Sequence, residues 1–381
     1  MRHSIVFSPK RIGWWLLCLP IGWVLCGCVS HPTDLYPIGI YGAQKTNDLP
    51  SISRAGFSLV AGPANRSYLN AAQQNGLRVL ASPHTTAGAG FSPGAAARAV
   101  QQLDGHPALW AWYLADEPDL NLVSPEAVNR AHRELKSVPA QKPTAVVLHN
   151  APNALYYAHT SDILMIDRYP IPWLPLANFG QHVRQTRLAL GPAKPLIAVI
   201  QAFDWSYYPE IMTQESNLRP PNHAELRCMT YLALAHQATG LFYYTFDDGR
   251  WRIDRHVETW QALRQVVIEI RQREPLFTAE HQWWPYRHNF GNWSNRFNRA
   301  LESSITPAWL RVRRGNAWVP PGNYLLLVNN TELDQRYRIT IPVPALESLP
   351  VLGEDRSVRL TKDWLQDDFG AYAVHVYGPF S

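Results

Sequence analysis

The sequence predicts an α/β protein with a (β/α)₈ TIM barrel followed by a small C-terminal antiparallel β-sandwich. Two observations carry this prediction. Eight short apolar segments alternate with helix-like segments between residues 35 and 275, and the apolar period changes after about residue 276. Hydrophobic residues make up 46% of the 381 residues, which is enough for a large core and excludes a disordered chain.

The eight apolar segments fit parallel strands that are buried on both faces, because each is a continuous apolar run. They are residues 36–42, 57–62, 77–82, 109–115, 144–149, 163–167, 195–201 and 240–246. A doubly wound open sheet is the alternative. It is disfavoured because no GxGxxG fingerprint follows the first predicted strand.

The segments between the strands carry helix signals. Ser92-Pro93 and Ser124-Pro125 each place an N-capping serine before a proline at the first helical position. The most strongly marked helices are predicted at residues 93–103, 125–135, 224–238 and 256–273. The first two connections are short, so their helices are predicted to be short.

The C-terminal part reads as short antiparallel strands separated by Gly, Pro and Asn turns. The predicted strands are residues 305–313, 323–328, 336–341, 357–360 and 371–377. We therefore predict a barrel domain at residues 35–275 and a β-sandwich domain at residues 276–381.

The first 27 residues are predicted to be a signal peptide. Three basic residues precede an apolar stretch, residues 12–25, that is shorter than the roughly 20 residues of a membrane-spanning helix. The following Leu25-Cys26-Gly27-Cys28 resembles the lipobox of bacterial lipoproteins. The resemblance implies that Cys28 is lipidated and that residues 28–34 form a tether. An uncleaved membrane anchor is the alternative.

Partner and compartment predictions follow from the processed chain. Val29, rather than Asp, follows Cys28, which by the same resemblance favours the outer membrane of a Gram-negative bacterium. Loss of Arg2, Lys10 and Arg11 lowers the formal net charge from +5 to +2, and no Lys/Arg-rich run indicates nucleic-acid binding. Cys228 would be the remaining thiol, so no intramolecular disulfide is expected.

The candidate site residues follow the predicted strands, because the C-terminal ends of barrel strands converge on the active site. They are Asp116 and Glu117 after strand four, His149 after strand five, Asp167, Arg168 and Tyr169 after strand six, Gln201 after strand seven, and Asp247 and Asp248 after strand eight. Aromatic residues follow strands six to eight at Trp173, Trp205, Tyr207, Tyr208 and Trp251.

These residue types suit cleavage of glycosidic bonds. One carboxylic acid protonates the leaving oxygen, a second carboxylate stabilises the sugar cation or activates water, and aromatic faces pack on sugar rings. The sequence has no HxH in the first strand, no HExxH, no glycine-rich phosphate loop and no GxSxG. We therefore predict no metal and no cofactor.

Several features together resemble the (β/α)₈ glycoside hydrolases of clan A, including β-galactosidase-like families. These are the strand layout, the acid after strand four, Arg219-Pro220-Pro221 before a helix, the eighth strand GLFYYTF and the appended sandwich. The resemblance implies that Glu117 is the general acid/base. The family usually has Asn where this chain has Asp116. Its strand-seven nucleophile, a Glu, is replaced by Gln201, which cannot be a nucleophile.

The second catalytic carboxylate stays open at this point. Asp167 is the first choice, Asp247 or Asp248 the next, and Asp204 or Glu215 the last. The predicted substrate-binding residues are Asp116, His149, Tyr169, Trp173, Gln201, Trp205 and Asp248. Two structural interpretations compete: a capping turn at Asp116-Glu117-Pro118, and an Asp167–Arg168 ion pair at the barrel rim.

The predicted function is therefore a glycosidase that acts on an extracytoplasmic carbohydrate. The alternative from another class is a carbohydrate-binding or cell-envelope scaffold lipoprotein whose barrel has lost catalysis. A barrel hydrolase that acts on non-sugar substrates is a third hypothesis, which fewer residues support.

Overall fold

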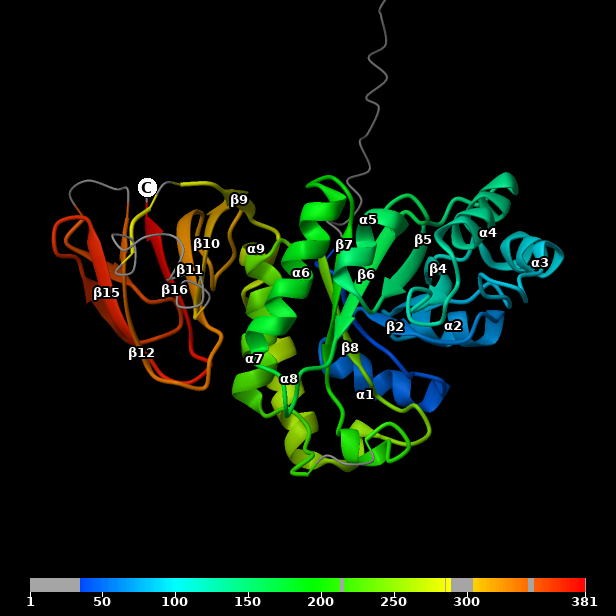
Figure 1. Cartoon of the computed structure of the whole chain (residues 1–381), viewed down its shortest axis with the longest axis horizontal. Helices are drawn as coiled ribbons and strands as arrows, with labels where there is room; N and C mark the ends of the chain where they lie inside the picture. Colours follow the sequence, from blue (N-terminus) through cyan, green and yellow to red (C-terminus); the bar gives the residue numbers. More distant parts are fainter. Residues whose placement is uncertain (1–34, 213–215, 285, 289–303, 342–345, 381) are drawn as a thin grey trace, which may run out of the picture. The chain divides into compact units, whose positions relative to one another are not determined.

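The eight predicted strands form a closed parallel barrel in strand order (Figure 1). The computed structural model describes residues 35–212, 216–284, 286–288, 304–341 and 346–380, so the predicted signal peptide, tether and Cys28 lie outside the described residues. The barrel strands are β1 (Ile38–Ile40), β2 (Leu59–Ala61), β3 (Arg78–Ala81), β4 (Leu109–Asp116), β5 (Thr144–Leu148), β6 (Ile163–Arg168), β7 (Leu196–Gln201) and β8 (Gly240–Tyr244).

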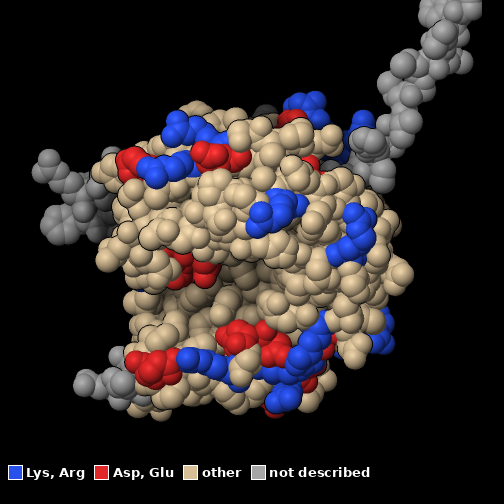
Figure 2. Space-filling model, turned by 90° about the vertical axis from the view of Figure 1, so that its right-hand side faces the viewer, with Lys and Arg blue, Asp and Glu red and all other residues tan. Residues whose placement is uncertain are grey.

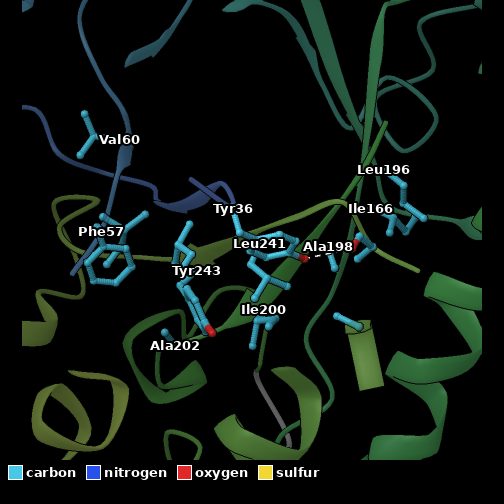
Figure 3. Close-up of a cluster of buried hydrophobic side chains, with 14 of the residues drawn as sticks. Tyr36, Phe57, Val60, Ile166, Leu196, Ala198, Ile200, Ala202, Leu241 and Tyr243 are labelled. Atoms are coloured by element: carbon cyan, nitrogen blue, oxygen red, sulfur yellow. Dashed lines mark hydrogen bonds between the residues drawn. The ribbon is translucent and has the colours of Figure 1, made fainter. Parts of the chain in front are cut away.

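Alternation along each strand separates two layers of the core. Phe242 of β8 belongs to the interior layer with Met165 and Val199. Its neighbours Leu241 and Tyr243 belong to the outer cluster, which Figure 3 shows. The Phe242 ring also explains a glycine. A Cβ on Gly39, its partner in β1, would lie 2.4 Å from that ring.

Helices follow the strands and cover the barrel. They are α1 (Leu49–Arg54), α2 (Arg66–Gln74), α3 (Pro93–Leu103), α4 (Pro125–Ser137), α5 (Ala154–Tyr157), α6 (Leu176–Leu190), α7 (His223–Ala235), α8 (Val257–Gln272) and α9 (Glu274–Phe277). The two predicted serine caps are confirmed, because Ser92 accepts from the Ala95 N–H and Ser124 from the Ala127 N–H. Within the described residues, no helix combines the length and apolar character needed to cross a membrane.

Helix α7 begins with a capping box. The Asn222 side chain accepts from the Glu225 N–H, and the Glu225 carboxylate accepts from the Asn222 N–H. Arg219 then holds the buried Glu225 carboxylate through two hydrogen bonds of 2.7 Å. The chain that returns from β7 is thereby fixed at the start of this helix.

We expect Asn222→Ala to lower the free energy of unfolding by about 0.5–2 kcal/mol, because a helix N-cap is lost. Urea denaturation would measure this. Asn129→Ala, in the interior of α4, is the matched control and should be neutral or slightly stabilising. Equal effects of the two changes would contradict the capping role.

The C-terminal strands form antiparallel sheets, as predicted. The strands are β9 (Glu280–Gln282), β10 (Ile305–Val312), β11 (Gly322–Asn329), β12 (Gln335–Thr340), β13 (Ser348–Pro350), β14 (Ser357–Arg359), β15 (Trp364–Phe369) and β16 (Val374–Phe380). The sheet orders are β16-β11-β10-β9, β12-β15 and β13-β14. The prediction missed β9, β13 and β15, and β16 begins three residues later than expected. In β15 only Leu365 and Phe369 are buried, so this strand has no apolar run to detect.

The four-stranded sheet has two apolar faces. Leu326 and Val328 belong to the same cluster as the outer layer of the barrel, whereas Leu325, Leu327 and Tyr377 face the cluster shared with the two small sheets. Residues 35–381 form one compact unit. The predicted division at residues 275 and 276 falls inside α9 and stays a prediction. The predicted core thiol is confirmed, because Cys228 is buried and its Sγ–H donates to the Asn329 carbonyl.

Candidate active site

A cavity of about 460 Å³ opens at the C-terminal ends of the barrel strands. Its lining residues come after β1, β4, β5, β6, β7 and β8. They are Tyr41, Asp116, Glu117, Leu120, Val147, His149, Asp167, Arg168, Tyr169, Trp173, Leu174, Phe203, Trp205, Tyr208, Ile211, Met212 and Tyr244. A hollow with Asp and Glu side chains at its edge is visible on the face shown in Figure 2.

A second cavity, of about 950 Å³, lies between α6 and the C-terminal strands. Among the described residues, its lining contains no carboxylate. The smaller cavity holds three carboxylates, from Asp116, Glu117 and Asp167. Because acid/base chemistry on a sugar needs carboxyl groups, the barrel cavity is the candidate active site.

Strand β4 brings two consecutive carboxylates into this cavity. Neighbouring residues of a regular strand point to opposite faces. Glu117 leaves the strand with φ 42°, a left-handed conformation that is uncommon outside glycine and is often found at functional sites. Asp119 fixes the turn, because its carboxylate accepts from the N–H groups of His149 and Asn150. The structural capping role predicted for this segment therefore falls to Asp119, which leaves Asp116 and Glu117 facing the cavity.

Glu117, His149 and Asp167 form one cluster. His149 Nδ1 lies 3.5 Å from Glu117 Oε1, and one polar atom of each of the three side chains lies within 4.8 Å of the others. Asp167 is the second-last residue of β6 and is only 3% exposed, whereas the Glu117 side chain is 21% exposed. Arg168 turns away from Asp167 and donates to Asn178 at 2.6 Å, so the predicted rim ion pair is replaced by this contact.

The two carboxyl groups of this cluster differ in the direction of their pKa shifts. Burial raises the pKa of Asp167 well above its ordinary value, and the hydrogen bond and negative charge of Glu117 raise it further. Burial would also raise the pKa of Glu117, but hydrogen bonds from His149 and Asp167 outweigh it and lower that pKa. Protonation of the pair is therefore favoured on Asp167 rather than on Glu117.

The same three side chains have a spacing that could hold a metal ion. We predict no metal, because burial and the charge of Glu117 favour a proton on Asp167, and that proton would compensate the paired carboxyl groups. Dialysis against EDTA should leave both the melting temperature and any hydrolytic activity unchanged. Loss of activity on dialysis with recovery on adding Zn²⁺ or Mg²⁺ would contradict the prediction.

Asp116 is held by tyrosine hydroxyls. The Tyr113 hydroxyl donates to Asp116 Oδ1, and the Tyr41 hydroxyl donates to Tyr113 at 3.3 Å. The Asp116 side chain is open to the cavity, but the surrounding protein removes part of its hydration and raises its pKa, against the lowering effect of the Tyr113 hydrogen bond. Tyr113 therefore fixes the orientation of the Asp116 carboxylate through its Oδ1 atom.

Gln201 lies beneath the cavity rather than in its wall. Its side chain is fully buried, accepts from the Ile171 N–H, and donates to the carbonyls of Ile171 and Phe203. The predicted contact of Gln201 with substrate is therefore corrected to a structural role, in which the amide joins the loops after β6 and β7.

We expect Gln201→Glu, which restores the carboxylate of the clan A pattern, to destabilise the protein without adding activity. A glutamate cannot donate to the two carbonyls and would be buried, so about 1–3 kcal/mol of unfolding free energy should be lost. Urea denaturation and a hydrolysis assay would measure the two effects. A stable and more active variant would contradict this account.

The two acids after β8 also lie outside the cavity lining. Asp247 binds Arg252 at 2.9 Å and Lys45 at 3.4 Å, and its backbone and Arg252 hydrogen bonds outweigh burial and lower its pKa. Asp248 accepts from the hydroxyls of Tyr208 and Tyr244 and so positions two tyrosines of the wall. The structure therefore favours neither as a residue that touches substrate.

The last two alternatives are no closer to the reaction centre. Asp204 caps a short 3₁₀ segment through the Ser206 N–H. Glu215 lies outside the described residues.

One wall of the cavity is aromatic. The predicted Tyr169, Trp173 and Trp205 all line it, and the Trp173 and Trp205 rings lie 5.6 Å apart. Trp251 does not, because it is fully buried and stacks on His256 at 3.8 Å. Tyr244 was missed as a wall residue. Period-two alternation along β8 could have found it, because Phe242 and Tyr244 lie on the same side of the strand.

The amino-acid sequence matches no protein-family model and no curated protein. Solved structures do resemble the fold. A glycoside hydrolase family 5 protein from Bacteroides vulgatus ATCC 8482 aligns with a TM-score of 0.57 and 12% identity over 90% of this chain and 88% of that chain. A variant of AmyP, in complex with maltotriose, aligns with a TM-score of 0.55 and 9% identity over 90% of this chain and 96% of that chain. An Anoxybacillus alpha-amylase aligns with a TM-score of 0.51 and 11% identity over 88% of this chain and 90% of that chain. This chain therefore has a barrel fold like that of glycoside hydrolases.

Proposed function

We propose that this protein is a glycoside hydrolase that acts on a glycan outside the cytoplasm, with Glu117 as general acid/base. The observation that carries the proposal is the cluster of Glu117, His149 and Asp167 in a cavity at the C-terminal end of the barrel. The pKa of Asp167 is raised and that of Glu117 lowered, which supports opposite protonation of the two carboxyl groups. Glycosidic cleavage needs a carboxyl group that gives a proton to the leaving oxygen and recovers one from water. The likeness of the fold to glycoside hydrolases supports the same class of reaction.

Glu117 and Asp167 have different proposed roles because they differ in exposure to the cavity. Glu117 faces the cavity, whereas Asp167 is almost fully buried. A bound sugar removes water from Glu117, which raises its pKa, so the proton moves from Asp167 to Glu117 and then to the glycosidic oxygen. Asp167 thus stores the proton, and His149 holds the Glu117 carboxylate in position through its Nδ1 atom.

The proposed substrate is a carbohydrate bound along the aromatic wall. Trp173, Trp205 and Tyr169 present ring surfaces to the cavity, and such surfaces bind the apolar faces of sugar rings. The Asp116 and Glu117 carboxylates on the same cavity supply acceptors for sugar hydroxyls.

The direct test is a screen of 4-nitrophenyl glycosides and bacterial or plant polysaccharides with wild type and Glu117→Gln, followed by chromatography and mass spectrometry of products. Hydrolysis by wild type that is strongly reduced in the variant supports the proposal. Equal turnover by both proteins would remove Glu117 from the reaction.

The alternative is a barrel that binds a carbohydrate without cutting it. The observation that favours it is Gln201, which occupies the position of the strand-seven nucleophile of clan A and is committed to backbone hydrogen bonds. Saturable binding of an oligosaccharide measured by calorimetry, with no product after prolonged incubation, would support this function instead.

We also propose a lipid anchor at Cys28, which would hold the protein in the cell envelope and, given Val29, in the outer membrane. The basis is the Leu25-Cys26-Gly27-Cys28 sequence after a basic and apolar leader. Metabolic labelling with radioactive palmitate should mark wild type but not Cys28→Ala. Equal labelling of both, or a membrane-bound Cys28→Ala with its leader intact, would contradict it.

A further inference from the structure

The general acid Glu117 lies on one wall of the cavity, and among the described residues no carboxylate lies on the opposite wall. Strand β4 stands opposite β8 in a closed eight-stranded barrel, so a conventional nucleophile for a sugar held by Glu117 would come from the wall built after β7 and β8. Among the described residues, that wall consists of Phe203, Trp205, Tyr208, Ile211, Met212 and Tyr244. None of these side chains is a carboxylate.

Asp167 does not fill this gap. Retaining glycosidases hold their two carboxyl groups about 5–5.5 Å apart so that the sugar carbon lies between them. Asp167 is 3% exposed, and one of its carboxylate oxygens lies within 4.8 Å of one from Glu117, so the pair is too close and too buried to hold a sugar carbon between the two groups. Burial and the charge of Glu117 raise the pKa of Asp167, which makes its carboxyl group less suited to attack a carbon atom.

Asp116 is the third carboxylate of the cavity. It is the last residue of β4 and directly precedes Glu117, so it lies beside the acid rather than opposite it. Tyr113 donates to its Oδ1 atom, and among the described residues no hydrogen bond to Oδ2 is formed. A carboxylate fixed by one oxygen, with the other open to the cavity, is built to accept an N–H or O–H from a ligand.

We propose that the nucleophile is the substrate's own 2-acetamido group, so that the site takes 1,2-trans glycosides of N-acetylhexosamines. This inference rests on the proposed glycosidase function and names its substrate class. Asp116 accepts the acetamido N–H and turns the carbonyl oxygen towards C1. The rings of Tyr41 and Tyr244, 5.7 Å apart beside Asp116, supply apolar surface for the acetamido methyl group.

The reaction balances with water as the only co-substrate. The acetamido oxygen forms a bond to C1 as the bond from C1 to the leaving oxygen breaks, and the Glu117 proton passes to that oxygen. The resulting oxazolinium ion keeps its N–H, and its positive charge is stabilised by the Asp116 carboxylate. Water then attacks C1 as the C1–O bond of the ring breaks, and Glu117 takes the water proton. The product has the same anomeric configuration as the substrate.

The test compares 4-nitrophenyl β-glycosides of N-acetylglucosamine and N-acetylgalactosamine with their 2-hydroxy counterparts. We expect kcat/KM to be at least roughly 10²-fold higher for one acetamido sugar, because an internal nucleophile acts at high effective molarity. Replacing the acetyl hydrogens by one, two and three fluorines should lower kcat/KM stepwise, since each fluorine weakens the carbonyl oxygen as a nucleophile. A thiazoline analogue of the oxazoline should inhibit competitively.

Asp116→Asn should lower kcat/KM on the acetamido substrate by roughly 10²-fold or more, with Asp334→Asn in the loop before β12 as an unaffected control. The fluorine series and the thiazoline use wild-type protein, so a variant that fails to fold leaves the test intact. Hydrolysis of 2-hydroxy glycosides at equal or higher rates, or insensitivity to fluorine, would overturn this inference and leave the proposed function standing. No hydrolysis of any glycoside would overturn both.

Discussion

Glu117→Gln is expected to lower kcat by about 10²–10⁴-fold while KM changes little, because general acid/base catalysis typically contributes that factor. The amide cannot give a proton to the glycosidic oxygen, yet it keeps the size of the side chain and can still contact His149. Steady-state kinetics on the substrate found by the glycoside screen would measure both constants. A rise in KM at constant kcat would instead indicate that Glu117 only binds substrate.

The leaving group provides an internal check on this prediction. A dinitrophenolate departs with little need for protonation, so the loss caused by Glu117→Gln should be much smaller for a dinitrophenyl glycoside than for a methyl or sugar leaving group. Glu134→Gln, an exposed change of the same chemistry on α4, is the matched control and should have no effect. A loss that is the same for every leaving group would contradict an acid role for Glu117.

The barrel could be predicted because parallel strands that are buried on both faces appear in the sequence as continuous apolar runs. All eight predicted strands exist within a few residues of their expected positions. The small C-terminal strands gave a weaker apolar pattern in the sequence. In β13 only Leu349 is buried, and in β14 only Val358, so neither strand has the apolar run by which strands are recognised.

The site could be predicted only as far as strand ends determine it. Asp116, Glu117, His149 and Asp167 share the cavity, as expected from their places after β4, β5 and β6. Position after a strand does not fix the direction of a side chain.

The partners that decide this direction come from distant loops. Gln201 points below the cavity because its amide is hydrogen-bonded to the backbone of Ile171, thirty residues earlier, and to the Phe203 carbonyl. The Asp247 carboxylate lies outside the cavity because it is hydrogen-bonded to Arg252 and Lys45. The left-handed conformation of Glu117, which follows Asp116 in the chain and accompanies the placement of both side chains on one cavity, has no signal in residue type, since glutamate rarely adopts it.

Asp167→Asn is expected to move the alkaline limb of the pH profile of kcat/KM to lower pH. In wild type the active form carries one proton on the pair, and Asp167 retains it to a pH above its ordinary range because of burial and the charge of Glu117. In the variant the second acid is missing, so the single proton lies on Glu117, whose pKa lacks the raising effect of a negative neighbour. That proton is lost at lower pH, so activity falls earlier as pH rises.

Asp167→Asn is also expected to change how the free energy of unfolding depends on pH. A carboxyl group whose pKa is raised by folding stabilises the protein fully below its unfolded pKa of about 3.9, and this stability is lost as pH rises through the folded value. The asparagine amide carries no charge at any pH, so the unfolding free energy of Asp167→Asn should fall less than that of wild type across this window. Urea denaturation at a series of pH values would measure it, with Asp334→Asn as the exposed control. Parallel pH curves for wild type and Asp167→Asn, in both activity and stability, would mean that Asp167 does not hold the shared proton.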